Sequence, residues 1–377
     1  MDGMTALDGI TRPTLVVDEA RARRNIARMA AKTAASGTRF RPHVKTHQSP
    51  TIASWYRDVG VDAITVSSVA MAERFAAAGW GDITIAFPFN PRETAALLSL
   101  VERDVRLGLI VDSTVATRRV IASGIAADVW LDVDAGYHRT GIGADDAAAL
   151  RDLATAIRGA SPRLRFAGVL THAGHTYGGR SRDEVLRIHE GSLAAMRRAQ
   201  ASLASAGIDA PISIGDTPAC NAADGFDGID EIRPGNFVLL DLQQLQTRTC
   251  SADDLALVVA CPVVGRYPER GSLVVHGGSA QLSRDSADGP DGGPVYGRVA
   301  EVERGASERG GGGDWLLGDP AAWLTSLAQE HGTITGPAAA LERHEIGSLV
   351  LVVPAHACLA CASIRDFVTL EGVPLDT

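Results

Sequence analysis

A regular alternation of short apolar runs with longer segments of helical spacing, from Thr14 to about Leu240, constrains the fold of this chain most strongly. Such alternation predicts parallel strands joined by crossover helices. About eight strands are expected, and no Gly-x-Gly-x-x-Gly motif follows the first, so a closed (β/α)8 barrel is favoured over a doubly wound sheet. The predicted strands are Thr14–Val17, Arg39–Val44, Asp62–Val66, Asp82–Phe87, Arg106–Val111, Asp128–Val133, Phe166–Thr171, Ile212–Gly215 and a run near Glu231–Leu240.

The pattern changes after about Cys250, where β-rich runs follow one another with few helical segments between them. These runs are Leu255–Val264, Ser272–His276, Val295–Val302 and Ile346–Val353. The stretches Asp285–Pro294 and Arg304–Gly313 are rich in glycine, aspartate and serine and are predicted to be surface loops. We therefore expect a barrel over residues 12–248 and a mainly β domain over residues 249–377, with residues 1–11 packed on the second domain.

The composition excludes several kinds of partner. Acidic residues outnumber basic ones by nine and no block of Lys or Arg is present, so neither nucleic acid nor an anionic membrane is expected to bind. The first residues lack the pattern of an export signal, and no apolar run is long enough to cross a bilayer. Five scattered cysteines favour a reducing compartment over a disulfide framework. We therefore expect a soluble, cytoplasmic protein.

The first candidate for chemistry is Lys45, which stands between His43 and His47. In an extended strand the three side chains would project to one face. A lysine that is partly desolvated among imidazoles is a better amine nucleophile near neutral pH, as a Schiff-base lysine must be. A solvated edge strand with basic residues explains this stretch equally well.

Further candidates follow the predicted barrel strands, at the end where barrel enzymes carry their active sites. Gly215-Asp216-Thr217 offers a tight turn, backbone amides and a hydroxyl, and Arg233-Pro234-Gly235-Asn236 offers a second glycine turn beside a cation. Two such turns on late strands suit a phosphate group, although each alone could be an ordinary strand-ending turn. The loop Asp134–Gly141 contains Arg139, which suits either a cofactor ring or a carboxylate, or else a surface salt bridge.

A candidate metal site lies near the end of the chain. His356 and Cys358 follow an apolar strand, and in an extended segment they would fall on the same side. A neutral imidazole and a thiolate are good Zn²⁺ ligands, and only two protein ligands suit a catalytic rather than a structural metal. A buried free cysteine with a neighbouring histidine is the alternative.

Six motifs together resemble the D-serine dehydratase/D-threonine aldolase family of fold-type III pyridoxal-phosphate enzymes, which are related to alanine racemase. The resemblance covers nearly the whole chain, in order. The motifs are Pro42-His43-Val44-Lys45-Thr46-His47, Leu170-Thr171-His172-Ala173-Gly174-His175-Thr176-Tyr177, Ile214-Gly215-Asp216-Thr217-Pro218, Arg233-Pro234-Gly235-Asn236, Gln329-Glu330-His331-Gly332 and Pro354-Ala355-His356-Ala357-Cys358.

The resemblance implies a site and an assembly. Lys45 would bind pyridoxal phosphate as a Schiff base, with His43 and His47 as further catalytic candidates whose roles stay open. The cofactor phosphate would sit among Thr217, Gly235 and Asn236, and the ring near Arg139, His172 and Tyr177. His356 and Cys358 would bind zinc. The family also implies a homodimer in which the β domain of one subunit covers the barrel mouth of the other.

The expected activity is dehydration of a D-configured β-hydroxy amino acid, such as D-serine or 3-hydroxy-D-aspartate, to a 2-oxo acid and ammonia. Similar dehydratases carry Cys at the position of Cys358, whereas D-threonine aldolases typically carry Asp there. Retro-aldol cleavage is the nearest alternative, and a non-catalytic binding protein for the cofactor is a more distant one. Gln48 and Asp216 depart from the family pattern. Arg41, Arg139 and Arg233 are all candidates for the substrate carboxylate.

Overall fold

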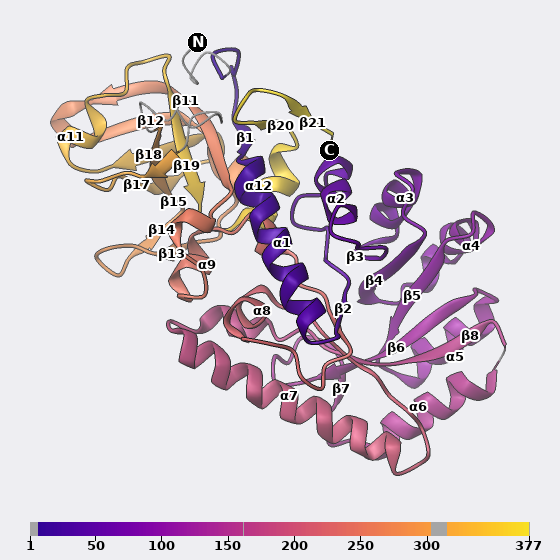
Figure 1. Cartoon of the computed structure of the whole chain (residues 1–377). Helices are drawn as coiled ribbons and strands as arrows, with labels where there is room; N and C mark the ends of the chain where they lie inside the picture. Colours follow the sequence, from indigo (N-terminus) through magenta and orange to yellow (C-terminus); the bar gives the residue numbers. More distant parts are fainter. Residues whose placement is uncertain (1–6, 161, 303–314, 377) are drawn as a thin grey trace. The chain divides into compact units, whose positions relative to one another are not determined.

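The computed structural model describes residues 7–160, 162–302 and 315–376. The predicted loop Arg304–Gly313 lies outside these residues, as do residues 1–6. The chain forms two compact units. One consists of Met1–Ile26, Thr46–Trp55 and Asn236–Thr377, and the other of Ala27–Lys45 and Tyr56–Gly235. Figure 1 shows the course of the chain through its helices and strands.

The second unit is a parallel sheet in the order β2-β10-β9-β8-β6-β5-β4-β3. A parallel bridge between His43 and Thr65 joins the β2 segment to β3 and so connects the two ends of the sheet. The predicted (β/α)8 barrel is therefore confirmed. Its strands are β2 Arg39–Phe40, β3 Ile64–Val66, β4 Asp82–Pro88, β5 Arg106–Val111, β6 Ala127–Asp134, β8 Leu164–Leu170, β9 Ile212–Ile214 and β10 Glu231–Ile232, and β7 Ile142–Gly143 pairs with β6.

Helices alternate with these strands, and several begin at a polar side chain that caps the first turn. Ser68, Ser113, Ser181 and Asp216 each accept a backbone N–H of the helix that follows. This capping fixes where each strand-to-helix loop ends, and so it positions the loops at the mouth of the barrel. The helices are α1 Glu19–Ala35, α2 Pro50–Arg57, α3 Val69–Ala77, α4 Thr94–Glu102, α5 Thr114–Ser123, α6 Ala147–Ala160, α7 Arg182–Ala204 and α8 Thr217–Ala222.

One predicted barrel strand belongs elsewhere. The strand β1, Thr14–Val17, pairs antiparallel with β11, Leu257–Tyr267, and parallel with β20, Phe367–Thr369. Its run of four residues is buried throughout, a pattern that fits a central strand of either sheet. Periodicity therefore found the strand, but it could not assign the sheet.

The first unit contains a mostly antiparallel sheet. The prediction that this part of the chain is mainly β is therefore confirmed. Since β11 pairs with both β19 and β12, the strands β12-β18-β17-β15-β19-β11 form a closed ring. Its core includes Trp315, Val258 and Val353. Besides β1, β11 and β20, the strands are β12 Ser272–His276, β15 Gly297–Val302, β16 Trp315–Leu317, β17 Trp323–Leu327, β18 His331–Thr335, β19 Leu349–Pro354 and β21 Pro374–Leu375.

Short elements complete this unit. The strands β13, Ala287–Asp288, and β14, Pro294–Val295, form a separate pair. The helices are α9 Leu242–Gln246, α10 Ser279–Leu282, α11 Ala338–Leu341 and α12 Ala357–Ile364. None of the helices in the described parts of the chain has both the length and the apolar character that a membrane crossing requires.

Candidate active site

Lys45 lies in a turn and not on a strand. The strand β2 ends at Phe40, and residues 44–47 form a turn after the bridge at His43. The prediction that His43, Lys45 and His47 share one face of an extended strand is therefore wrong, because the turn interrupts the alternation. His43 nevertheless contacts the lysine, since the backbone N–H of Lys45 lies 3.3 Å from Nδ1 of its ring. The Lys45 side chain is half-buried, as a reactive amine at a barrel mouth should be.

His47 is fully buried and accepts the backbone N–H of Ser49 on Nδ1, at 3.0 Å. This contact fixes the ring within its own turn. A catalytic role for His47 stays a prediction.

Lys32, the other lysine of the chain, has a structural environment. Its ammonium donates to the carbonyl oxygens of Cys220, Asn221 and Ala223, at 2.8, 3.2 and 2.6 Å. Burial lowers its pKa, but all three donors of the ammonium are already used. Lys45 is the lysine whose setting suits a covalent anchor.

The loops after β6 and β8 form an aromatic and cationic wall near Lys45. Tyr137 stacks on His175 with ring centroids 5.9 Å apart, and it meets His172 edge-on at the same separation. A side chain at Gly174 would collide with the Tyr137 ring, so glycine is required there. The guanidinium of Arg139 lies 5.3 Å from the Tyr137 ring centre.

His172 is neutral in this environment. Desolvation, together with the positive charges of Lys45 and Arg139, lowers its pKa to about 3. Its Nδ1 contacts the carbonyl oxygen of Gly215, which fixes the ring. The structure thus brings Lys45, Arg139 and His172 together, as a flat cofactor with ionisable groups would require.

The predicted phosphate turn offers an unused hydroxyl. Thr217 is 1% exposed, and its Oγ1 has no hydrogen-bond partner among the described residues. A buried hydroxyl without a partner is costly, so this atom suits a bound phosphate oxygen. Gly215 lies so close to Arg233 that a side chain there would be crowded, which accounts for the glycine. These observations fit pyridoxal phosphate.

Asp216, the unexpected acid in this turn, points into the fold. Its Oδ1 accepts the Thr176 hydroxyl and the N–H of Ala219, both at 2.8 Å. Burial raises the pKa of its carboxyl. The residue serves as the N-cap of α8, so its presence does not argue against a phosphate beside Thr217.

The side chain of Asn236 has a partner within the fold. Its amide nitrogen lies 2.5 Å from Oδ2 of Asp241, which is fully buried. The phosphate role of Gly235 and Asn236 stays a prediction. Tyr177 is half-buried in the turn Gly174–Gly178, and its place beside the cofactor also stays a prediction.

The proposed metal ligands lie together at the start of a helix. His356 is the N-cap of α12 and Cys358 lies in its first turn, so the expectation of an extended segment is wrong at Cys358. The helix still brings the two side chains into hydrogen-bond contact. Burial disfavours a charged His356, but the negative charges of Cys358 and Asp241 outweigh it and raise its pKa well above the ordinary value.

The site therefore favours a positive charge beside the His356 ring nitrogen and the Cys358 sulfur. Nitrogen and sulfur are ligands that zinc prefers. His356 Nδ1 lies 3.0 Å from Asp241 Oδ2, and the Thr46 hydroxyl lies 3.2 Å from Cys358 Sγ. Within residues 7–160, 162–302 and 315–376, no cluster of three or more His, Cys, Asp or Glu side chains could hold a metal ion. A metal held by His356 and Cys358 therefore stays a prediction.

The structure narrows the candidates for a substrate carboxylate. Arg41 is buried and paired with Asp82 and Glu231, at 2.5 and 2.7 Å. Arg233 is also buried, and it donates to the backbone oxygen of Thr171 at 2.6 Å. Arg139 is exposed and makes no hydrogen bond or ion pair with any residue that the structure describes.

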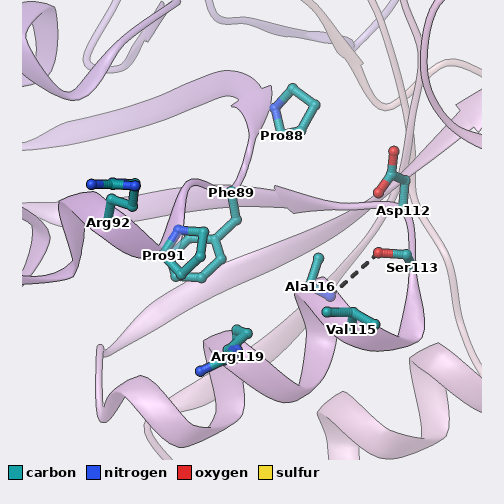
Figure 2. A pocket seen from close by; sticks show the side chains of 9 residues that line it. All are labelled: Pro88, Phe89, Pro91, Arg92, Asp112, Ser113, Val115, Ala116 and Arg119. Carbon is teal, nitrogen blue, oxygen red and sulfur yellow. Dashed lines mark hydrogen bonds between the residues drawn. The ribbon is translucent and has the colours of Figure 1, made fainter.

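A separate pocket of about 660 Å³ lies between the loops that follow β4 and β5. Figure 2 shows Phe89 and Pro91 close to one another in it, with Asp112 and Ser113 on the other side. None of the predicted site residues lines this pocket, which is bounded by Pro88, Phe89, Pro91, Arg92, Asp112, Ser113, Val115, Ala116 and Arg119.

Comparison with known proteins decides the family. The "Alanine racemase, N-terminal domain" family matches residues 17–242, and the "Putative serine dehydratase domain" family matches residues 256–370. The D-threo-3-hydroxyaspartate dehydratase of Delftia sp. (strain HT23) is 34% identical over 96% of this chain and 94% of that protein. The chain belongs to the D-serine dehydratase/D-threonine aldolase family.

Other members of the family agree. The D-serine dehydratase of Dictyostelium discoideum is 24% identical over 96% of this chain and 93% of that protein. The solved structure of the Delftia dehydratase has a TM-score of 0.87, with 98% of each chain covered. D-threonine aldolase from Filomicrobium marinum shares the fold, with a TM-score of 0.79 over 97% of this chain and 95% of that one.

Three residues of the candidate site escaped the sequence reasoning. The side chain of Thr46 contacts Cys358, and that of Tyr137 contacts His172. Both residues lie inside stretches that the sequence analysis names, but no sequence pattern shows these contacts. Asp241 lies outside every motif. The one signal for it is its position before a short helix, where an aspartate is a common N-cap.

Proposed function

We propose that this chain is a pyridoxal-phosphate- and zinc-dependent dehydratase, an ammonia-lyase, for a D-configured β-hydroxy amino acid such as D-serine or 3-hydroxy-D-aspartate. The His356–Cys358 pair beside the Thr46 hydroxyl carries the proposal, because the family's dehydratases have Cys where the aldolases typically have Asp. The relatedness to a D-threo-3-hydroxyaspartate dehydratase supports it. A variant of that enzyme with cysteine replaced by alanine has been solved in a metal-free form.

The residues of the site have distinct roles in this reaction. Pyridoxal phosphate, when bound, supplies an electron sink for the charge that develops at the substrate α-carbon. Lys45 is the anchor for it and the base that takes the α-proton, while the backbone contact with His43 orients the turn. The Thr217 hydroxyl would bind the phosphate, and the neutral His172 would pack beside the ring without adding charge.

The proposed metal ligands have a separate role in the reaction. Zinc, when bound, is a Lewis acid that turns a hydroxyl into a better leaving group. His356 and Cys358 would hold it, and the peptide bond between Lys45 and Thr46 links the base to the residue that contacts Cys358. Loss of water from the amino acid, followed by hydrolysis of the resulting imine, yields the 2-oxo acid and ammonia.

We assign a substrate carboxylate to Arg139. Arg41 and Arg233 are buried and already bind neighbouring groups of the fold, whereas Arg139 is exposed and close enough to His172 to affect its pKa. Its planar fork suits a carboxylate.

The activity is tested by incubating the purified protein with D-serine, D-threonine and D-threo-3-hydroxyaspartate, and by assaying oxo acid, aldehyde and ammonia separately. Equal amounts of oxo acid and ammonia are expected, from the D-enantiomers alone. Aldehyde without ammonia would show an aldolase. If the protein binds pyridoxal phosphate but turns over none of the three substrates, it is a non-catalytic binding protein.

Zinc is tested with Cys358→Ala. This variant should retain pyridoxal phosphate, lose zinc, and lose most of its dehydratase activity, and EDTA treatment of the wild-type protein should have the same effect. Full activity in the metal-free wild-type protein would remove zinc from the reaction.

We further propose a homodimer in the cytoplasm. The exposed apolar side chains of Phe87 and Val115, 57% and 69% exposed, suit burial against a second subunit. The five cysteines, all among the described residues, form no disulfide, as suits a reducing compartment. Light scattering should give twice the mass of one chain, and cell fractionation tests the location. Limited proteolysis tests the proposed division into residues 12–248 and 249–377.

A further inference from the structure

The Asp241 side chain makes several polar contacts, and the proposed reaction assigns it no role so far. Its side chain is fully buried between η3, Asn236–Val238, and α9. Oδ1 accepts the N–H of Gln244, at 2.9 Å, as an N-cap. Oδ2 lies 2.5 Å from the amide nitrogen of Asn236 and 2.8 Å from the N–H of Ala357. Three donors therefore hold the carboxylate before His356 is considered.

This fixed carboxylate meets the ring of His356, whose Nδ1 lies 3.0 Å from Oδ2. The N–H of Ala357, the residue after His356, donates to the same oxygen, so both the backbone and the ring of the metal-ligand segment are held by one atom. A histidine whose one ring nitrogen is held by a carboxylate binds metal through the other, with its orientation already set.

We propose that Asp241 is the positioning residue of the metal site: it holds His356 Nδ1 so that Nε2 is presented to zinc beside Cys358. Asn236, next to the glycine of the second phosphate turn, anchors the same oxygen and thereby ties the turn to the metal ligand. The inference rests on the zinc site proposed above. Asp241 is not itself a metal ligand in this assignment.

The test measures zinc affinity, not activity. Wild-type protein loaded with pyridoxal phosphate is stripped of metal, and zinc is titrated in competition with a chromogenic chelator. Asp241→Asn keeps the size of the side chain and the cap oxygen for Gln244, and it should weaken zinc binding 10- to 100-fold. Ser68→Ala, which removes an N-cap of α3 far along the chain, should bind zinc like the wild type and shows what loss of a cap alone does.

Two results would overturn the inference. One is a folded Asp241→Asn protein, with its cofactor absorbance intact, that binds zinc as tightly as the wild type. The other is a crystal structure of the zinc-loaded protein in which a carboxylate oxygen of Asp241 binds the zinc, because this would make Asp241 a direct ligand. A wild-type protein that binds no zinc would instead refute the proposed metal site itself.

A measurement on the wild-type protein covers the case in which Asp241→Asn does not fold. With ¹⁵N-labelled histidine and bound zinc, the His356 ring, identified by its absence from His356→Ala, should be protonated at Nδ1 and metal-bound at Nε2. Metal on Nδ1 would refute the assignment.

Discussion

The hydroxyl oxygen of Thr46 lies 3.2 Å from the sulfur of Cys358, and Thr46 is the residue that follows Lys45 in the chain. A hydrogen bond to a thiolate stabilises its negative charge and so helps Cys358 to remain a metal ligand. Thr46→Val keeps the shape of the side chain but removes the donor. It should weaken zinc binding about tenfold, since a hydrogen bond to a charged group contributes about 1.5–3 kcal/mol.

Chelator competition on the protein loaded with pyridoxal phosphate measures this change. Thr46→Ser retains the hydroxyl and is the matched control, which should stay near the wild-type affinity. A valine variant with unchanged zinc affinity would show that the contact has no part in metal binding.

The choice between the two lysines is tested by absorbance. Lys45→Ala should lose the visible-range band of the lysine-bound cofactor, whereas Lys32→Ala should keep it. Because Lys32 holds three backbone carbonyls at the end of α8, its replacement should instead lower the stability of the fold. A visible band that persists in Lys45→Ala would mean that another group anchors the cofactor.

The sequence predicted the positions of strands better than it predicted which strands pair with one another. Strands such as β5 and β12 agree with the predicted runs at both ends, because most of their apolar residues are buried and each strand pairs with a neighbour on both sides. Thr14–Val17 is equally apolar, yet its partners lie more than 200 residues away, at Leu257–Ala260 and Phe367–Thr369, and no local pattern encodes such pairing. The hairpin of β17 and β18 was missed because its burial is uneven.

For the candidate site too, the sequence predicted local features and did not predict long-range contacts. Residue type and spacing pointed to Lys45, Thr217, His356 and Cys358, because their chemistry is unusual where they stand. The turn at residues 44–47 and the helix that begins after His356 are set by tertiary contacts, so the strand-based geometry for both stretches was wrong. Asp241 acts through a contact that spans more than 100 residues, and a single sequence cannot show it.

The phosphate assignment predicts a role for one hydroxyl. Thr217→Val should raise the dissociation constant for pyridoxal phosphate about tenfold, because the buried Oγ1 without a partner is lost as a donor to the phosphate. Equilibrium dialysis against the free cofactor measures this, with Thr217→Ser as the control that keeps the hydroxyl. Equal affinities in the valine and serine variants would place the phosphate elsewhere.

Arg139 should bind a carboxylate of the substrate. Arg139→Leu is expected to raise KM tenfold or more with little change in how much cofactor is bound, because a charge-assisted pair is lost. A rise for D-threo-3-hydroxyaspartate alone assigns Arg139 to the side-chain carboxylate, and equal rises with D-serine assign it to the α-carboxylate. Unchanged KM for both substrates would refute the assignment.

The neutral state of His172 predicts how stability changes with acid. Its pKa is about 3 in the folded protein and about 6.5 when unfolded, so between these values the unfolded chain binds a proton that the folded one does not. Stability therefore falls as pH drops below about 6.5, and at pH 5 this one group accounts for about 2 kcal/mol of the loss. His172→Gln cannot take up the proton. Urea unfolding at pH 7 and pH 5 should show a smaller loss in this variant, while exposed His331→Gln should lose as much as the wild type. Equal losses in all three proteins would mean that His172 is not kept neutral by the fold.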